Sequence, residues 1–391
     1  MEDFQGYKVG LFVNNSSLSP PPFSYSFSIS DNIYLNFPLL TLNFPDGSGI
    51  FLEYGNFTQG IPLNIKYGIS NIVDMLDVNF YSTGRDAIEP ITGTPGLSGN
   101  LQINGTHESF LINRDALKIA FKEITISDIV KKIFPSEELL KVEETKGKVE
   151  AYDIDDNYTF VKEFLLPQAT NGKVRPYVFF RNLLNELHFE SIEFLENNAP
   201  SEKLFFGNIE DENGNAYNVL NSFLPFNESI NKTMINFHVE GKILKDDLTI
   251  EKMTKSIASD SNNKIPVLSN TRIHHEEYFN RQFNPKVEYS QLNNAYCANI
   301  IKSAIFLDKA FGTIAFHPNL VAGKVVDISV TILDEEGKPE LSETFSGKWL
   351  IEQSYHYWDG FNKKGMTKLI FCRSSMKPRQ DSIIIDRSFS D

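Results

Sequence analysis

The segment "GKWLIEQSYHYW", from Gly347 to Trp358, sets the fold class expected for the end of this chain. Aromatic and aliphatic residues recur along it without a break, which is typical of a long β-strand. Successive side chains of a strand point to opposite faces. One face is predicted to carry Trp349, Ile351, Gln353, Tyr355 and Tyr357. The other is predicted to carry Lys348, Leu350, Glu352, Ser354, His356 and Trp358. The first face is expected to fill a core and the second to meet polar surroundings.

The composition indicates a globular, β-rich protein. The chain has 391 residues, of which 41% are hydrophobic and 23% are charged, and this length suits two or three domains. It contains 32 Phe and 15 Tyr, residues that favour pleated, half-buried surfaces. The formal net charge of −14 disfavours binding to nucleic acid or to anionic lipid, which requires a basic footprint.

The cysteines and the chain start predict no secreted or membrane protein. Cys297 and Cys372 are too few for a disulfide framework, so we expect two free, buried thiols. The N-terminus lacks the ordered regions of a signal peptide, and no apolar run approaches the ~18 residues needed to span a membrane. We therefore expect a protein made in a cytoplasm, without membrane insertion.

The first 110 residues read as strands separated by turns. The apolar segments at 7–13, 23–29 and 33–44 are divided by "LSPPP" at 18–22, and "PDGSG" follows at 45–49. Asp-Gly between apolar runs is a strong hairpin signal. Short strands at this regular spacing predict a barrel or a sandwich.

Three segments show helical spacing of apolar residues. The first is "TISDIVKKIF" at 125–134, with Thr125 or Ser127 as the N-cap and Pro135 at its end. The second is "PYVFFRNLLNEL" at 176–187, and the third is "NAYCANIIKSAIFLDKAFG" at 294–312. The polar stretch between the first two is predicted to be loop with one strand. After residue 312 the chain is again predicted to be β.

The sequence motifs predict no catalytic, cofactor or metal site. "HHEE" at 274–277 lacks metal-ligand spacing, and "DIDDN" at 153–157 lacks the glycine and the glutamate of a calcium loop. "GTPGLSG" at 93–99 is not followed by the Gly-Lys-Ser/Thr of a phosphate cradle. His356 is interpreted as a strand histidine that is hydrogen-bonded to its neighbours or to a partner subunit.

The order of elements near the C-terminus resembles that of a known family. A predicted helix leads into a strand and then a turn with Pro318, Leu320 and Gly323. A strand with Trp349, Ile351 and His356 follows. The last strand ends near Phe371 and Arg373. This pattern resembles the baseplate hub proteins of contractile phage tails, which are related to the valine-glycine-repeat spike proteins of type VI secretion. The segment at 124–134 resembles the short helix that opens the middle domain of these hubs.

The resemblance implies an α+β, mostly β fold with two similar, tube-like β-barrel domains and a mixed α/β insertion domain. The expected parts are an N-terminal barrel (1–110), an α/β domain (111–200), a mixed β segment that completes both (201–290), and a helix with a C-terminal barrel (291–391). Core and assembly candidates are Trp349, Ile351, Tyr355, Tyr357, His356, Pro318 and Gly323.

The function that the resemblance implies is structural and not enzymatic. The chain would be a trimeric hub in the virion baseplate, joining the sixfold tail tube to the threefold central spike and lining the DNA channel. Its partners would be two further copies, the spike, the tail tube and tape-measure proteins, and neighbouring baseplate proteins. Two other classes stay open: a β-rich carbohydrate-binding protein or adhesin, and a glycan-degrading tail enzyme with two opposed carboxylates.

Overall fold

The computed structural model describes residues 2–4, 7–14, 16–17, 25–46, 59–69, 75–90, 99–111, 115, 117–135, 137–153, 156–169, 171, 177–207, 218–227, 308–334 and 336–373. Within these residues most of the chain is β, and one 15-stranded sheet dominates. This agrees with the mostly β fold expected from the sequence. A search of the same residues for a helix long and apolar enough to cross a membrane finds none.

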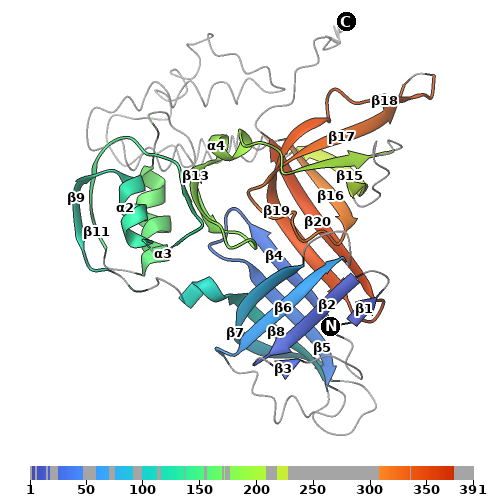
Figure 1. Ribbon diagram of the computed structural model, residues 1–391, viewed down its shortest axis with the longest axis horizontal. Coiled ribbons are helices and arrows are strands. Elements are labelled where there is room, and N and C mark those ends of the chain that lie inside the picture. Colours follow the sequence, from blue (N-terminus) through green and yellow to red (C-terminus); the bar gives the residue numbers. More distant parts are fainter. Residues whose placement is uncertain are drawn as a thin grey trace, which may run out of the picture.

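The N-terminal half of the sheet is a curled, antiparallel array (Figure 1). Its strands run in the spatial order β1-β2-β6-β7-β8-β5-β4. Their bounds are β1 (Glu2–Phe4), β2 (Tyr7–Val13), β3 (Ser16–Ser17), β4 (Ser26–Asn32), β5 (Leu39–Asp46), β6 (Pro62–Ile69), β7 (Leu76–Pro90) and β8 (Gly99–His107). Alternate side chains of β4 and β5 are buried, as expected for a sheet with one face on a core.

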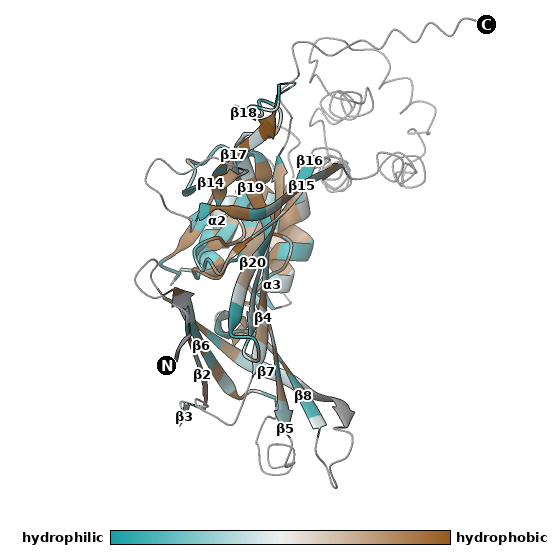
Figure 2. Cartoon of the chain, turned by 90° about the vertical axis from the view of Figure 1, so that its right-hand side faces the viewer, coloured by the Kyte–Doolittle hydropathy of each residue, from teal (hydrophilic) through white to brown (hydrophobic). Residues whose placement is uncertain are grey.

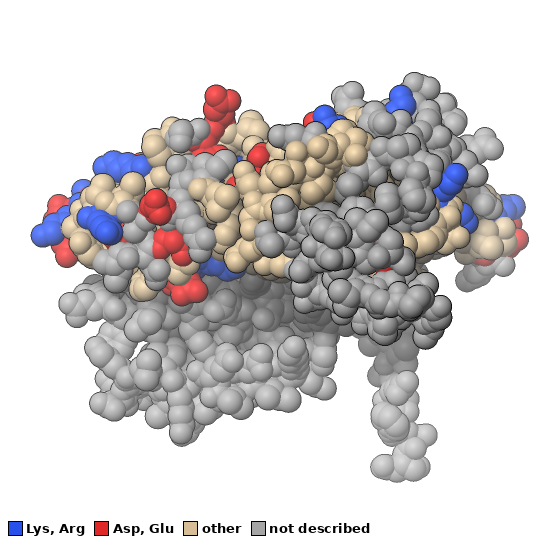
Figure 3. All heavy atoms as spheres, turned by 90° about the horizontal axis from the view of Figure 1, so that it is seen from below, with Lys and Arg blue, Asp and Glu red and all other residues tan. Residues whose placement is uncertain are grey.

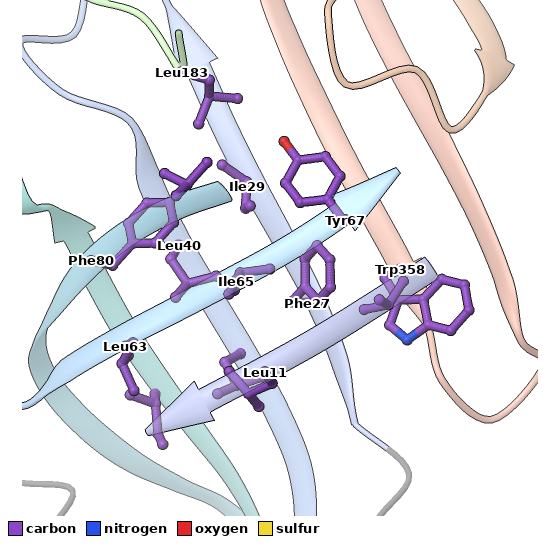
Figure 4. Close-up of a cluster of buried hydrophobic side chains, with 14 of the residues drawn as sticks. Leu11, Phe27, Ile29, Leu40, Leu63, Ile65, Tyr67, Phe80, Leu183 and Trp358 are labelled. Carbon is purple, nitrogen blue, oxygen red and sulfur yellow. The ribbon is translucent and has the colours of Figure 1, made fainter. Parts of the chain in front are cut away.

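These strands enclose the largest apolar cluster, which we call the N-terminal core. Figure 4 shows side chains from β2, β4, β5, β6 and β7 converging on one another, with Trp358 reaching in from a distant part of the chain. The members labelled there are Leu11, Phe27, Ile29, Leu40, Leu63, Ile65, Tyr67, Phe80, Leu183 and Trp358. Aromatic rings take a large share of this core, as the Phe-rich composition predicts.

The C-terminal half of the sheet comprises β14 (Glu202–Phe206), β15 (Leu220–Asn227), β16 (Asp308–Ala315), β17 (Val325–Leu333), β18 (Pro339–Leu341), β19 (Gly347–Asp359) and β20 (Lys364–Arg373). Hydrogen-bonded neighbours follow the order β14-β17-β19-β20-β16-β15. A bridge between Phe205 and Val219 brings the start of β15 back beside β14. Apolar side chains from these strands form a second cluster, the C-terminal core.

Strand β19 belongs to both halves, and this explains its length. Its first residues, Gly347–Leu350, pair with β17, while Gln353–Asp359 pair with β4. Strand β20 pairs with β19 from Leu350 to Asp359. A β-bulge between Ile351 and Gln353 lies where the partner changes. A bulge adds one residue to a strand, so the alternation of its side chains shifts by one position.

The elements between the two halves lie at the left of Figure 1. They are η1 (Glu108–Leu111), β9 (Ala120–Ile124), α2 (Ile126–Ile133), β10 (Leu140–Val142), β11 (Val149–Tyr152), α3 (Asn157–Thr159), η2 (Phe160–Leu165), η3 (Leu166–Gln168), β12 (Tyr177–Arg181), β13 (Leu187–Ser191) and α4 (Ile192–Glu196). Helix α2 confirms the first predicted helix, and the Thr125 side chain accepts a hydrogen bond from the Asp128 N–H at its N-terminus.

Two of the predicted helices require correction. The described part of the segment at 176–187 is strand β12 and the turn into β13, and these two strands pair antiparallel as a β-hairpin. The predicted third helix at 294–312 falls largely outside the described residues, but its last part belongs to strand β16, with Gly312 inside the strand. In addition, α3, η2 and η3 form one continuous helical segment, and its start, Asn157–Thr159, lies at the end of the polar stretch (141–159) that was expected to be loop with one strand. Its signal is Asp156, whose carboxylate accepts hydrogen bonds from the Tyr158 and Thr159 N–H groups.

Several other predicted features, including "HHEE" at 274–277, Cys297 and the segments at 228–290, lie outside the described residues.

Candidate functional site: a junction between the cores

Residues 316–324, the junction loop between β16 and β17, reach into three different cores. Leu320 packs in the C-terminal core and Val321 in the N-terminal core. Ala322 packs in a third cluster, between the sheet and the β12–β13 hairpin. Three consecutive residues therefore hold three parts of the molecule together.

Gly323 allows this loop to approach both the hairpin and β19. Its φ of +83° lies in the left-handed region, and an added Cβ would stand 2.6 Å from Cζ of Phe180. The Gly323 N–H donates to the Ile351 carbonyl at 2.9 Å, and the Ile351 N–H donates to the Lys324 carbonyl at 2.8 Å. The junction loop is thus tied to β19 directly beside the bulge.

Asp31, at the end of β4, joins the same three parts through one carboxylate. Its Oδ2 accepts hydrogen bonds from the Leu183 N–H, in the β12–β13 turn, and from the Ala322 N–H, each at 3.1 Å. The side chain is fully buried, and burial raises its pKa to about 7, against the opposing effect of these hydrogen bonds.

An ion network lies on the hairpin beside the junction loop. Glu186 contacts Nζ of Lys141 at 2.6 Å, Nζ of Lys324 at 2.9 Å and Nε2 of His188 at 3.4 Å. Burial opposes ionisation of Glu186, but hydrogen bonds from these three groups hold its pKa well below the usual range. His188 also contacts Glu190 at 2.6 Å, and the two carboxylates raise the histidine pKa against the effect of burial. Lys324 therefore links the junction loop electrostatically to the hairpin.

His356 lies inside the sheet close to the junction loop and is fully buried. Its ring nitrogens are 3.3 Å from Oγ of Ser354 and 3.2 Å from Oγ1 of Thr367, and that hydroxyl accepts a hydrogen bond from the His317 N–H at 2.9 Å. Burial, together with the nearby His317, lowers the pKa of His356 to about 3, so its imidazole is neutral at pH 7. A buried, neutral, hydrogen-bonded ring connects β19 to β20 and to the junction loop.

The bulge residue Glu352 is held by a buried ion pair with Lys309 of β16, at 3.0 Å. Nearer the start of β19, the Arg373 guanidinium lies 4.0 Å from the centroid of the Trp349 ring and donates to the Thr344 carbonyl. These contacts fix the conformation of β19 where it changes partners.

The structure brings most of the sequence-predicted residues to this junction. Trp349 and Ile351 are buried in the C-terminal core, and Pro318 and Gly323 are buried in the junction loop. The assignment of strand faces is wrong beyond the bulge: Tyr355 and Tyr357 are only half-buried, whereas the even-numbered Ser354, His356 and Trp358 are buried. The cause is the extra residue of the bulge, which interrupts simple alternation.

Asp31, Glu186 and His188 were not recognised from the sequence. The two backbone partners of Asp31 are 152 and 291 positions away along the chain, and no local pattern marks so distant a contact. A weak signal exists in "NLLNELHFE" at 182–190, where polar residues interrupt an apolar run.

These features define a class of protein: a β-rich scaffold in which buried polar groups connect the two halves of the sheet, the β12–β13 hairpin and the junction loop. Among the described residues, no three His, Cys, Asp or Glu side chains are grouped so that they could hold a metal ion. Cys372 is a free, buried thiol, and burial raises its pKa.

Solved structures of phage tail proteins share this fold. The 43 kDa tail protein of prophage MuSo2 from Shewanella oneidensis superimposes with a TM-score of 0.54 at 10% identity, covering 94% of this chain and 98% of that protein. The tail protein from Neisseria meningitidis MC58 gives a TM-score of 0.50 at 12% identity, covering 95% of this chain and 98% of that one. No protein-family model matches the chain, and no curated protein matches it significantly.

Proposed function

We propose that this chain is a structural protein of a phage tail or of a phage-tail-like particle. The observation that carries the proposal is the superposition on two tail proteins over nearly their whole length. A shared domain alone would support a shared building block, whereas agreement over 98% of each neighbour supports a shared role. The buried, neutral state of His356 fits a scaffold, because a catalytic base must reach its substrate.

Within this role we assign the chain to the baseplate hub. The N-terminal and C-terminal halves of the sheet would act as two similar barrel units, so that a homotrimer presents six units to the sixfold tail tube and threefold symmetry to the central spike. The division at 1–110, 111–200, 201–290 and 291–391 belongs to this proposal. Strand β19 supports it, since a strand shared by both halves fixes the angle between them.

The hub would line a passage for DNA and contact the spike, the tube and tape-measure proteins and neighbouring baseplate proteins. Three copies with a formal charge of −14 each would repel DNA and favour its passage. Figure 3 shows acidic and basic side chains interspersed towards the ends of the molecule in the view from below. Tyr355 and Tyr357, which are half-buried, are candidates for contacts between subunits.

Electron microscopy of the intact particle tests the assignment. Antibody-labelled or tag-labelled chain should lie in a threefold ring between tube and spike. Labelling at the fibre tips, with binding on a glycan array, would favour an adhesin instead. Loss of turbidity of a cell-wall suspension treated with the purified chain would favour a glycan-degrading enzyme.

A further inference from the structure

An exposed apolar ribbon projects from the C-terminal half of the sheet. The end of β17 pairs with β18 to form this ribbon, which we call the arm (residues 331–334 and 336–341). Leu333 is 67% exposed and Leu341 is 50% exposed, although both belong to paired strands. Figure 2 shows the arm at the top of the described sheet, with hydrophobic colouring near β18. Large apolar side chains exposed together mark an interaction surface.

The arm is acidic, and hydrogen bonds join the described residues of its turn. Exposed or half-exposed Asp334, Glu336 and Glu340 outnumber Lys338, which already pairs with Glu336 at 2.6 Å. One carboxylate oxygen of Asp334 accepts the N–H groups of Glu336 and Lys338, at 2.9 and 2.7 Å.

A second exposed surface has the opposite charge. The tip (residues 359–368), formed by the β19–β20 turn and the start of β20, exposes Phe361, Lys363, Lys364, Met366 and Lys368. Phe361 is 62% exposed. The carboxylate in this region, Asp359, is occupied by hydrogen bonds from the Phe361 and Asn362 N–H groups and from the Asn362 side chain.

The tip is held rigidly. The Gly360 N–H donates to the Tyr25 carbonyl at 3.0 Å, and an added Cβ on Gly360 would collide with that oxygen at 2.1 Å. The turn therefore sits directly against the start of β4.

We propose that the arm of one copy docks on the tip of a second copy, so that this chain associates head to tail. Each surface pairs exposed apolar side chains with charges of the sign that the other surface attracts. Figure 1 shows the two surfaces at opposite ends of the C-terminal strands, the arm above and the tip beside β1 below. One copy cannot satisfy both surfaces itself, and a contact between unlike surfaces closes into a ring or continues as a filament.

The arm–tip contact could join the subunits of the homotrimer proposed above. Only the number of copies in the assembly rests on that proposed function. Two copies of formal charge −14 repel each other on average, and the contact between the acidic arm and the basic tip would offset this repulsion.

Single substitutions test each surface. Leu333→Asp in the arm and Phe361→Asp in the tip should each convert the wild-type oligomer to monomer in sedimentation velocity. Leu224→Asp is the matched control, since Leu224 is equally exposed on β15 but lies on neither surface. It should sediment like the wild type, and all three variants should keep the wild-type circular dichroism.

A mixing experiment gives the sharper result. The Leu333→Asp chain retains its tip, and the Phe361→Asp chain retains its arm. An equimolar mixture should therefore form a dimer with one copy of each variant and nothing larger. A mixture that stays monomeric, or a single variant that stays fully oligomeric, would overturn the contact.

The outcomes separate this contact from the hub assignment. A trimeric wild type whose two variants also remain trimers would leave the hub standing and reject the arm–tip contact. A dimer in the mixing experiment, with a wild-type assembly of any number other than three, would support the contact and reject the trimeric hub. A wild-type chain that stays monomeric at every concentration would reject self-docking and leave the arm to a different protein.

Discussion

At the scale of single residues, Gly323 shows how one backbone position holds the junction. Replacing it with alanine adds a left-handed strain of about 1–2 kcal/mol and forces the Cβ into the Phe180 ring, which costs about 1–3 kcal/mol more. Gly337 is the matched control, because its φ is +78° and nothing lies within 4 Å of an added Cβ. Urea unfolding should show a clearly larger loss of stability for Gly323→Ala than for Gly337→Ala. Equal losses would mean that the Phe180 contact is absent.

The sequence indicates some of these residues but not their roles. The turn containing Pro318, Leu320 and Gly323 stands out as a pattern, because a proline and a glycine mark a tight loop. Asp31 does not stand out, since an acid near a strand end is ordinary surface chemistry. Only the approach of two distant backbone segments turns its carboxylate into a buried link.

At the scale of elements, strand β19 was predicted from the sequence, but the bulge inside it was not. The strand itself follows from its aromatic and aliphatic run, and its buried positions before the bulge follow from alternation. The bulge depends on the change of partner from β17 to β4, which is a tertiary event. It moves burial from Tyr357 to its neighbour Trp358.

The bulge makes a direct prediction for these adjacent residues. Trp358→Ala should cost about 3–5 kcal/mol, because it leaves a cavity in the N-terminal core. Tyr357→Ala should cost less than about 1.5 kcal/mol, since the tyrosine is half-buried. Guanidinium unfolding of both variants measures the difference. A larger loss of stability for Tyr357→Ala than for Trp358→Ala would mean that the side chains alternate without a bulge.

The β12–β13 hairpin shows why a helix was predicted in error. Phe179 packs in the cluster around α2, Phe180 in the cluster beside the junction loop, and Leu183 in the N-terminal core. A strand buried on both faces carries a continuous apolar run, which spacing alone does not distinguish from a helix. Helix α2 was predicted because it has one buried face and a capping threonine.

At the scale of the whole molecule, buried histidines make the fold sensitive to acid. Burial lowers the pKa of His107 to about 3, of His317 to about 4 and of His356 to about 3. Each lies below the unfolded value of about 6.5, so the stability that each provides is complete above that pH and is lost progressively as the pH falls from about 6.5 through the folded values. We expect a loss of about 2 kcal/mol per histidine between pH 6.5 and 5, measurable by urea unfolding. A profile that is flat over this range would contradict their burial.

Asp31 has the opposite effect, and this separates it from the histidines. Its pKa, raised to about 7 by burial, lies above the value of 3.8 expected when it is unburied. Its contribution to stability is therefore complete below pH 3.8 and is lost as the pH rises through 7. Asp31→Asn removes this titration. As the pH falls from 8 to 4, the free energy of unfolding of the wild type should rise by up to about 4 kcal/mol relative to that of the variant. The variant should therefore lose stability in acid more steeply than the wild type.

A second aspartate provides the control for this measurement. Burial opposes ionisation of Asp77, but the hydrogen bonds from Lys66 and Asn64 and the Lys66 charge together lower its pKa, so its contribution to stability is lost as the pH falls. Asp77→Asn should therefore shift the profile in the direction opposite to Asp31→Asn, and by less, because the Asp77 side chain is half-exposed. If the difference in free energy of unfolding between the wild type and Asp31→Asn stays constant from pH 4 to 8, the Asp31 carboxylate is in contact with water. The three parts of the molecule would then be held by their apolar cores and by the Glu186 network alone.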